Sequence, residues 1–479
     1  MKKTAVKVVS GALILCMLFW HANHVLAVKY DDGIYSVTNF YELEKNTVDV
    51  LVLGSSHAYM SFNTGVLWRE HGISSYLLTA SAQPLWNTYY YLKEALKTQK
   101  PKLIVLEGYR LLEEEEFLDA GYVIKSTYGL KWSKNRLDAI RASAPQEDWP
   151  GYLLGYTQYH DRYQELSEED FTSGKEAEKY ETWKGFELGM TAQPMDQPDF
   201  GTCTGCLSLT EKTEKYYRAI IELAQAQGIP IMVVIAPYGG MTQEDQKKFH
   251  TAERIAGEYQ VPFFNYNLME DELWIDYGTD MFNTSHLNGR GSCKFTSYWG
   301  EYIAGQYDMP DHRGDPAYDS WERNAVYLDA LMEDISLRET ADAAQIPDCL
   351  VRDNYEIFVS ADGYCQTEAE AVKGVLEKLG ISDTDGGGLW YFTGGENLAW
   401  SSGSGEASRY FETNRHDFGL ERVQTGDGGY DNAIVIDNQR YRTVENGLNV
   451  VVFDSVTGMV ADSFGMDADN EYRLCRDCN

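Results

Sequence analysis

Ser56 and His286 are the residues of this chain whose types and settings best suit nucleophilic catalysis. The segment VDVLVLGSSHAY, residues 48–59, predicts a buried β-strand that runs into a glycine and two serines. A serine hydroxyl becomes a good nucleophile only when a neighbouring base takes its proton. His286, in NTSHLNGRG (283–291), follows the last predicted strand and is the candidate base. The alternative is that both segments are ordinary turns, since Gly, Ser and Asn are common there.

Alternating strands and helices are expected to position these two residues. The predicted apolar strands lie at 48–54, 74–81, 102–108, 229–238 and 262–267. The predicted helices lie at 64–72, 86–99, 210–228 and 244–260, with a final helix that ends near 307. This pattern predicts an α/β domain whose parallel sheet is covered on both faces. Such sheets carry their chemistry at the carboxyl ends of the strands, so Ser56 and His286 are expected at one edge.

The alternation stops at residues 109–207, which we interpret as a large insertion over the sheet. Near its start is the acidic run EEEE, residues 113–116, which we predict to be the solvated face of a helix.

The two segments that carry Ser56 and His286 resemble the SGNH/GDSL hydrolase superfamily. GSSH (54–57) stands where the family has its Gly-Asp-Ser block, and NTSHLNGRG stands before the last helix. More narrowly, the chain is similar to the exported branch that includes polysaccharide O-acetylation proteins, and the resemblance covers about residues 35–306. It implies a flavodoxin-like sandwich with a central parallel sheet, with Ser56 as nucleophile and His286 as catalytic histidine.

The chain departs from the family pattern at two places. The family's Asp-x-x-His block has Asn283 in place of the acid, and Asp280 or Asp276 are the expected substitutes. An amide can hold an imidazole ring by a hydrogen bond but cannot stabilise an imidazolium by charge.

The family's oxyanion-hole asparagine is not recognisable in LEGYR (106–110), and Gln83 or Asn87 are the expected donors instead. His57 is expected to be a structural neighbour rather than a second base.

The carboxyl-terminal part is predicted to be a separate, smaller β-rich domain at 346–479, joined by a helical linker at 307–345. Residues 353–381 and 447–469 resemble the interleukin-like EMT inducer domain. That resemblance implies a compact β-sandwich, in some members linked to carbohydrate contact; a structural appendage without a ligand is the alternative. From the residues alone, Val450 to Phe453 is a strand, DSVTG a turn, and MVADSF the second strand of a hairpin.

The first 28 residues predict export. Lys2, Lys3 and Lys7 precede an apolar run at 8–20, which is typical of a secretory signal peptide. Continued to residue 28, the segment is long enough to cross a bilayer as an anchor. The chain is therefore expected at the cell surface, either anchored in the membrane or secreted after cleavage.

Charge and cysteines limit the partners. A formal charge of −33 excludes nucleic acid as an expected partner, because a polyanion would be repelled. Of eight cysteines, the pairs in CTGC (203–206) and CRDC (475–478) have metal-ligand spacing, and zinc, disulfides and free thiols all stay open. Neither a metal nor a cofactor is expected at the site.

These observations and resemblances predict an exported serine-dependent esterase that acts on O-acyl groups of a surface glycan. A polysaccharide O-acetyltransferase with the same site, supplied by a membrane-bound acyl donor protein, is one alternative. A catalytically decayed glycan-binding protein is the other.

Overall fold

The computed structural model forms two compact units, Met1–Ala325 and Val326–Asn479, which meet within helix α15 (Asp319–Glu339). The described residues are 2–27, 32–154, 159–166, 170–171, 183–199, 203–269, 274–362, 365, 369–382, 384, 387–403, 405–413, 416–426 and 428–476.

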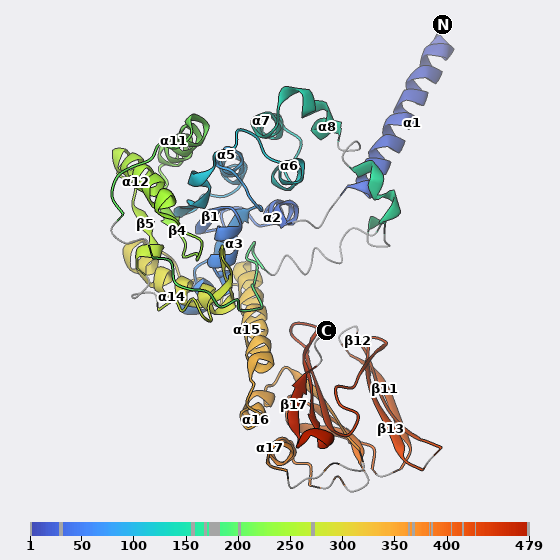
Figure 1. The fold of residues 1–479 in the computed structure, drawn as a ribbon. Helices are drawn as coiled ribbons and strands as arrows, with labels where there is room; N and C mark the ends of the chain where they lie inside the picture. Colours follow the sequence, from blue (N-terminus) through green and yellow to red (C-terminus); the bar gives the residue numbers. More distant parts are fainter. Residues whose placement is uncertain are drawn as a thin grey trace. The chain divides into compact units, whose positions relative to one another are not determined.

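The first unit is built on a five-stranded parallel sheet in the order β2-β1-β3-β4-β5 (Figure 1). Its strands are β1 (Val50–Gly54), β2 (Ser75–Thr79), β3 (Leu103–Glu107), β4 (Ile231–Ile235) and β5 (Phe263–Asn265). The first four are buried along their whole length, as their continuous apolar sequences require. The predicted α/β class is therefore confirmed at the level of a parallel sheet with helices.

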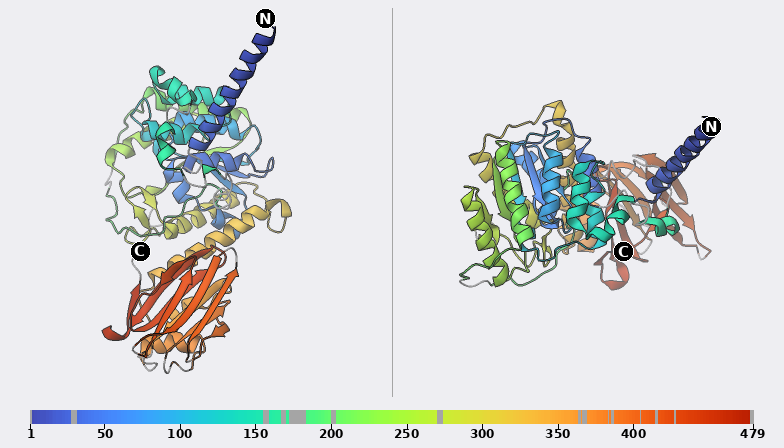
Figure 2. Two further views of the ribbon diagram at one scale, coloured as in Figure 1. Left: turned by 90° about the vertical axis from the view of Figure 1, so that its right-hand side faces the viewer. Right: turned by 90° about the horizontal axis from the view of Figure 1, so that it is seen from above.

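Helices cover the sheet of the first unit (Figure 2). One face packs against α5 (Leu85–Ala95), α11 (Glu211–Ala226) and α12 (Gln243–Glu258), whose buried residues join those of β1, β3 and β4 in one core. A second group contains α4 (Thr64–His71) and α14 (Gly289–Gln306), which pack against each other. These helices begin and end within a few residues of the predicted bounds, and the largest difference is at α5, which ends at Ala95 and not at 99. Thr210 caps α11 by accepting from Thr213 N, and Gly72 ends α4 in the left-handed conformation.

The other described helices of the first unit are α1 (Lys2–Leu26), α2 (Asp32–Phe40), α3 (Ser56–Ser61), α6 (Ala120–Thr127), α7 (Lys134–Ser143) and α8 (Trp149–Leu154). The short 3₁₀ helices described there are η1 (Tyr109–Leu112), η2 (Gln146–Asp148), η3 (His160–Gln164), η5 (Tyr266–Leu268) and η6 (Pro316–Tyr318). A small antiparallel hairpin, β6 (Met281–Asn283) and β7 (His286–Leu287), precedes α14.

The acidic run at 113–116 is not a helix, so that prediction is wrong. It follows η1 as irregular chain. Glu113 forms an ion pair with the half-buried Arg110, and Glu114 pairs with Lys248 at 2.5 Å. Burial makes a guanidinium costly without a carboxylate partner, and these local and distant pairs outweigh the helical propensity of glutamate.

The second unit contains two antiparallel sheets. The six-stranded sheet has the order β10-β9-β8-β15-β16-β17, with β10 (Asn397–Ser401), β9 (Gly388–Thr393), β8 (Tyr355–Ala361), β15 (Gly447–Asp454), β16 (Met459–Asp467) and β17 (Arg473–Arg476). The four-stranded sheet is β11 (Ala407–Thr413), β12 (His416–Gln424), β13 (Tyr430–Ile436) and β14 (Gln439–Tyr441). The predicted hairpin is confirmed as β15 and β16.

The two sheets enclose an aromatic core, in which Phe358 stacks on Phe418 with ring centroids 5.3 Å apart. A second core of this unit includes residues of α16 (Ile346–Leu350) and α17 (Glu370–Lys378). The C-terminal region is therefore β-rich, as predicted, with two helices added.

Helix α1 contains an 18-residue stretch, Val9–Leu26, of mean hydropathy 1.5, which is long and apolar enough to cross a membrane. The same features suit a signal sequence, so they are compatible with both versions of the predicted N-terminus.

The seven described cysteines are free thiols, so of the three states left open for CTGC the structure has the free thiols. Within the described ranges no group of three or more His, Cys, Asp or Glu side chains is placed to hold a metal ion. Cys478 lies outside the described residues, so the CRDC pair is not settled.

Candidate active site

Ser56 occupies the first turn after β1, which lies between β2 and β3 in the sheet. Gly54 ends β1, Ser55 keeps an extended backbone as the N-cap, and α3 begins at Ser56. A Cβ at Gly54 would lie 2.9 Å from the Cβ atoms of both Ala58 and Glu107, so only glycine lets the chain turn this tightly. The hydroxyl is thus carried by a helix start at the carboxyl edge of the sheet, as expected.

His286 is held by its own hairpin. Asn283 stands opposite it in the β6–β7 pair, and Asn283 Oδ1 lies 2.9 Å from His286 Nδ1. The same Oδ1 accepts from the backbone N–H of Ser285 at 2.8 Å. Because a backbone N–H only donates, that side-chain atom is the amide oxygen. His286 Nδ1 must therefore carry the proton, which leaves the lone pair on Nε2.

Burial keeps this imidazole neutral. Desolvation lowers the pKa of His286 to about 4, well under its ordinary value of 6.5. His286 Nε2 is buried and has no hydrogen-bond partner among the described residues. A neutral ring with an unused lone pair is the form that a general base requires.

Ring contacts place the start of α3 beside His286. Helix α3 packs against β7, and the ring centroid of His57 lies 5.0 Å from that of His286. His57 also stacks on Tyr109 at 3.5 Å, and Tyr238 meets both rings edge-on at 5.2 Å. The two segments, about 230 residues apart in the chain, therefore meet at one edge.

Ser56 and His286, the candidate nucleophile and base, are not directly hydrogen-bonded: among the described residues, no hydrogen bond joins them. Catalytic hydrogen bonds without substrate are often long, and they tighten only when the substrate binds.

Several buried polar atoms at this edge lack hydrogen-bond partners within the described part of the chain. They are Ser55 Oγ, His57 Nδ1, Glu107 Oε2, Tyr238 Oη and His286 Nε2. Buried polar atoms are nearly always paired in folded proteins, so a cluster of exceptions calls for a reason. A bound polar molecule would satisfy such atoms, which is the usual arrangement in a binding site.

Glu107 is a candidate that sequence reasoning missed. It ends β3 next to Gly54, and its Oε1 accepts from Tyr109 N at 3.1 Å. Complete burial raises the pKa of Glu107 to about 8. At neutral pH this carboxyl is therefore mostly protonated and can donate a hydrogen bond. The available signal was a carboxylate that closes an otherwise apolar strand, LIVLE.

His57 is placed as a structural neighbour of the site, as expected. Its ring is buried, and burial lowers its pKa well below the ordinary value, with His286 contributing. Packed against Tyr109, it forms part of the wall of the site.

Neither expected substitute for the acid orients His286. Asp280 is buried with its carboxylate held by Lys294 Nζ at 2.5 Å and by Asp276 N at 2.8 Å. Asp276 accepts from Gly278 N in a tight turn. The prediction for Asp280 is wrong because the ammonium of α14 satisfies this carboxylate, and the amide of Asn283 takes the position beside the ring.

Of the two predicted oxyanion donors, Gln83 uses its amide nitrogen elsewhere, whereas Asn87 is engaged only through its oxygen. Gln83 Nε2 donates to Thr88 Oγ1 at 3.1 Å, and Asn87 Oδ1 accepts from Ser143 Oγ at 2.9 Å. Neither bonds Ser56 or His286 within the described part of the chain. Both side chains are fully buried, and among the described residues Asn87 Nδ2 has no hydrogen-bond partner, so the role of Asn87 as a donor stays a prediction.

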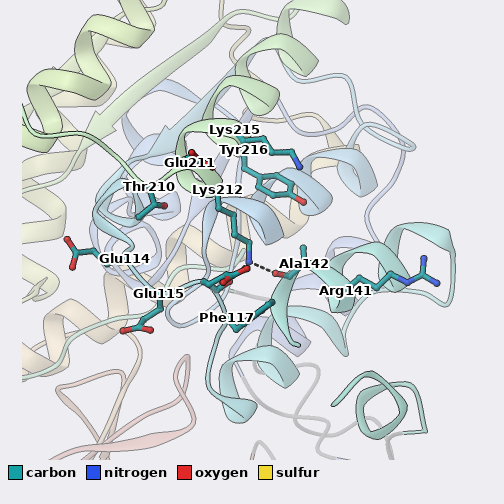
Figure 3. A pocket seen from close by; sticks show the side chains of 11 residues that line it. Glu114, Glu115, Phe117, Arg141, Ala142, Thr210, Glu211, Lys212, Lys215 and Tyr216 are labelled. Atoms are coloured by element: carbon teal, nitrogen blue, oxygen red, sulfur yellow. Dashed lines mark hydrogen bonds between the residues drawn. The ribbon is translucent and has the colours of Figure 1, made fainter. Parts of the chain in front are cut away.

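A separate cavity of about 630 Å³ lies between the 114–117 loop, α7 and the start of α11 (Figure 3). Lys212 reaches across it to the carbonyl of Ala142 at 2.6 Å and lies 3.7 Å from the centroid of the Trp86 ring. Acidic and basic side chains are mixed around its wall, and the lysine ties three segments together. None of the predicted site residues lines it.

In comparisons with known proteins, no protein-family model and no curated protein matches the chain.

Proposed function

We propose that this protein is an exported serine-dependent acyl esterase of the SGNH type, acting on O-acyl groups of a surface polysaccharide. The observation that carries the proposal is the unprotonated, unpartnered His286 Nε2 beside the helix start that presents Ser56. The resemblance of the two motifs supplies the substrate class, and the apolar N-terminal helix suits export.

The mechanism has two steps. Ser56 Oγ attacks the ester carbonyl carbon while its proton passes to His286 Nε2. The tetrahedral intermediate then expels the sugar hydroxyl, which takes that proton, and leaves an acyl-serine. Water attacks the acyl-serine, His286 again accepts and returns a proton, and the carboxylic acid leaves.

The amide of Asn283 limits the rate of this mechanism. It holds the ring in the correct tautomer, but it supplies no negative charge to stabilise the imidazolium that forms in each step. The protonated Glu107 and the backbone N–H groups that start α3 are the donors available to a developing oxyanion.

A sugar hydroxyl in place of water would make the same site an O-acetyltransferase. The burial of His286 Nε2 favours this second candidate, because exclusion of water allows an acyl-serine to wait for another acceptor.

The test is covalent labelling with a fluorophosphonate. The full chain should be labelled on Ser56, and Ser56→Ala should abolish labelling. Ser55→Ala is the matched control, because Ser55 Oγ is the neighbouring buried hydroxyl, and this variant should still be labelled.

Labelling that survives in Ser56→Ala would contradict the proposal. An unlabelled wild type that still binds glycan would favour the decayed, glycan-binding alternative. Mass analysis of an acetylated oligosaccharide incubated with an unacetylated one separates hydrolysis, which gives free acetate, from transfer, which gives the newly acetylated sugar.

A further inference from the structure

Helix α1 exposes a large apolar surface, which is unfavourable in water. Its 25 residues span about 37 Å at 1.5 Å per residue, and a bilayer core is about 30 Å thick. Large apolar side chains are exposed along it, including Leu15 at 68%, Met17 at 64% and Trp20 at 67%. Exposed apolar side chains of this kind are costly in water and stable in lipid, so we infer that a lipid bilayer surrounds the middle of α1.

The end of α1 belongs to the folded unit. The carbonyl of Leu26 accepts from Arg162 Nη1 at 2.7 Å, and Arg162 Nη2 pairs with Asp170 at 2.9 Å. Val25 and Leu26 are buried, unlike the middle of the helix. Cleavage after Ala27 would remove a helix end that Arg162 binds. These contacts therefore favour an anchor that is kept over a signal peptide that is lost.

The chain from this anchor to the site is very short. Five residue steps join Ala27 to Asp32, which at full extension reach no more than about 18 Å. Asp32 begins α2 at the carboxyl end of β2, where its carboxylate accepts from Ser81 N at 3.1 Å. Gly33 lies against Ala80 so closely that a Cβ would clash.

The start of α2 lies beside the candidate site. Ser81 Oγ lies 2.9 Å from Tyr59 Oη, and Tyr59 is in α3, the helix that Ser56 begins. Strand β2 is the neighbour of β1, with Thr79 paired to Gly54, and adjacent strands lie about 4.8 Å apart. The segment that joins α1 to α2, which we call the tether, thus attaches at the same edge of the sheet as Ser56, one strand away.

We propose that the acyl ester used by this site is carried by a membrane-held molecule, such as a lipid-linked saccharide or acyl donor, and is processed at the bilayer surface. The proposal rests on the proposed function. A tether this short keeps Ser56 within a thin layer above the membrane. There a membrane-held ester has a high effective concentration, whereas distant polymer is beyond reach.

The test lifts the site away from the bilayer. The full chain is reconstituted in vesicles of phosphatidylcholine and phosphatidylglycerol. The lifted variant carries a 20-residue EAAAK-type helical spacer after Val28, which adds up to about 30 Å. The control carries the same spacer after Gly314, an exposed glycine with open space around it. One substrate is soluble umbelliferyl acetate, and the other is the same ester joined by a short spacer to phosphatidylethanolamine.

All three proteins should cleave the soluble ester equally. The lifted variant should cleave the lipid-linked ester more than about tenfold more slowly, and a lipid spacer lengthened by about 30 Å should restore the rate. Equal rates on the short lipid ester would overturn the inference. Failure of the wild type on the soluble ester would instead overturn the proposed function.

A distance measurement tests the placement without catalysis. A donor dye on a non-natural amino acid at Gly121, in the helix whose Lys125 pairs with Asp32, should transfer energy efficiently to acceptors on lipid headgroups. Transfer should fall in the lifted variant but not in the control. Weak transfer in the wild type, or extraction of the protein by carbonate as a soluble oligomer, would show that α1 does not hold the site at the bilayer.

Discussion

Each unit of this protein buries a polar cluster, and the two clusters differ in how they are completed. In the second unit, the buried Asp334 accepts from Tyr355 Oη at 3.1 Å and from Thr457 Oγ1 at 3.4 Å, and among the described residues Oδ2 of the nearby Asp454 is the atom left without a partner. In the first unit, five polar atoms at the sheet edge have no such partners. Side chains of the protein pair most of the second unit's cluster, whereas the cluster of the first unit leaves five polar atoms for a bound molecule to satisfy.

The comparison separates a cluster that should stabilise the fold from the cluster to which we assign the proposed chemistry. A network of paired groups adds stability and specifies one arrangement, whereas unpaired groups cost stability unless they are used. Substitutions in the two clusters should therefore separate loss of stability from loss of activity.

The largest effect is expected at His286. His286→Ala removes the only proposed base, so kcat/KM for a soluble ester should fall by about 10³-fold or more. The unfolding midpoint should change little, because the lost Nε2 has no partner in the fold. An unchanged rate in a steady-state assay would end the Ser-His mechanism.

A large effect on stability, without one on activity, is expected at Asp334. Burial and Asp454 raise its pKa to about 7, from 3.8 in the unfolded chain. Its contribution to stability is therefore complete below about pH 4 and is lost as the pH rises through 7. Asp334→Ala, which strands Tyr355 Oη, should cost about 1–3 kcal/mol.

Hydrogen exchange on the full chain can locate this effect. Exchange should speed up in β8 and β15 and stay unchanged in β1 and β4, with normal ester turnover. Asp334→Asn should remove the pH dependence. Faster exchange across both units, or slower turnover, would show that the two clusters are not independent.

An intermediate effect on activity is expected at Asn283. Asn283→Ala frees the ring to rotate and should lower kcat by about 10–100-fold. Asn283→Asp should raise the pKa of His286 by about 1–2 units, because a carboxylate would face Nδ1. The acidic limb of the pH–rate profile would then move upward from about 4. A profile that does not move would place the titrating group elsewhere.

The smallest effect at neutral pH is expected at Glu107. With a pKa of about 8, the wild-type carboxyl ionises in mildly alkaline solution, and a new negative charge beside a developing oxyanion should slow the reaction. Glu107→Gln should stay within about threefold of wild type at pH 7 and keep its rate at pH 9. A wild type that loses no activity between pH 7 and 9 would exclude Glu107 from the site.

Much of the first unit could be predicted from sequence because its strands are apolar throughout and its helices have local caps. Ser56 and the hairpin residue His286 could be placed at one edge for the same reason. What failed depended on distant partners. Asp280 was assigned to His286 because the two are close in sequence, but Lys294 binds it. The helix predicted at 113–116 rests on the helical propensity of glutamate, but in the structure this run is irregular chain that pairs with Arg110 and Lys248.

Glu107 shows a different limit. No pattern of neighbours announces a protonated carboxyl, because its state depends on burial beneath segments that lie far away in the chain. The unpaired atoms at the sheet edge are likewise a property of the assembled fold.

The order in which the chain is made has a consequence for when it can act. Ser56 follows the first strand, and His286 belongs to the hairpin after the last, so about 230 residues of synthesis separate them. A nascent or truncated polypeptide that stops before this hairpin presents a hydroxyl without its proton acceptor. Under the proposed function, reactivity toward esters would thus be absent during synthesis and would begin only once the first unit is complete.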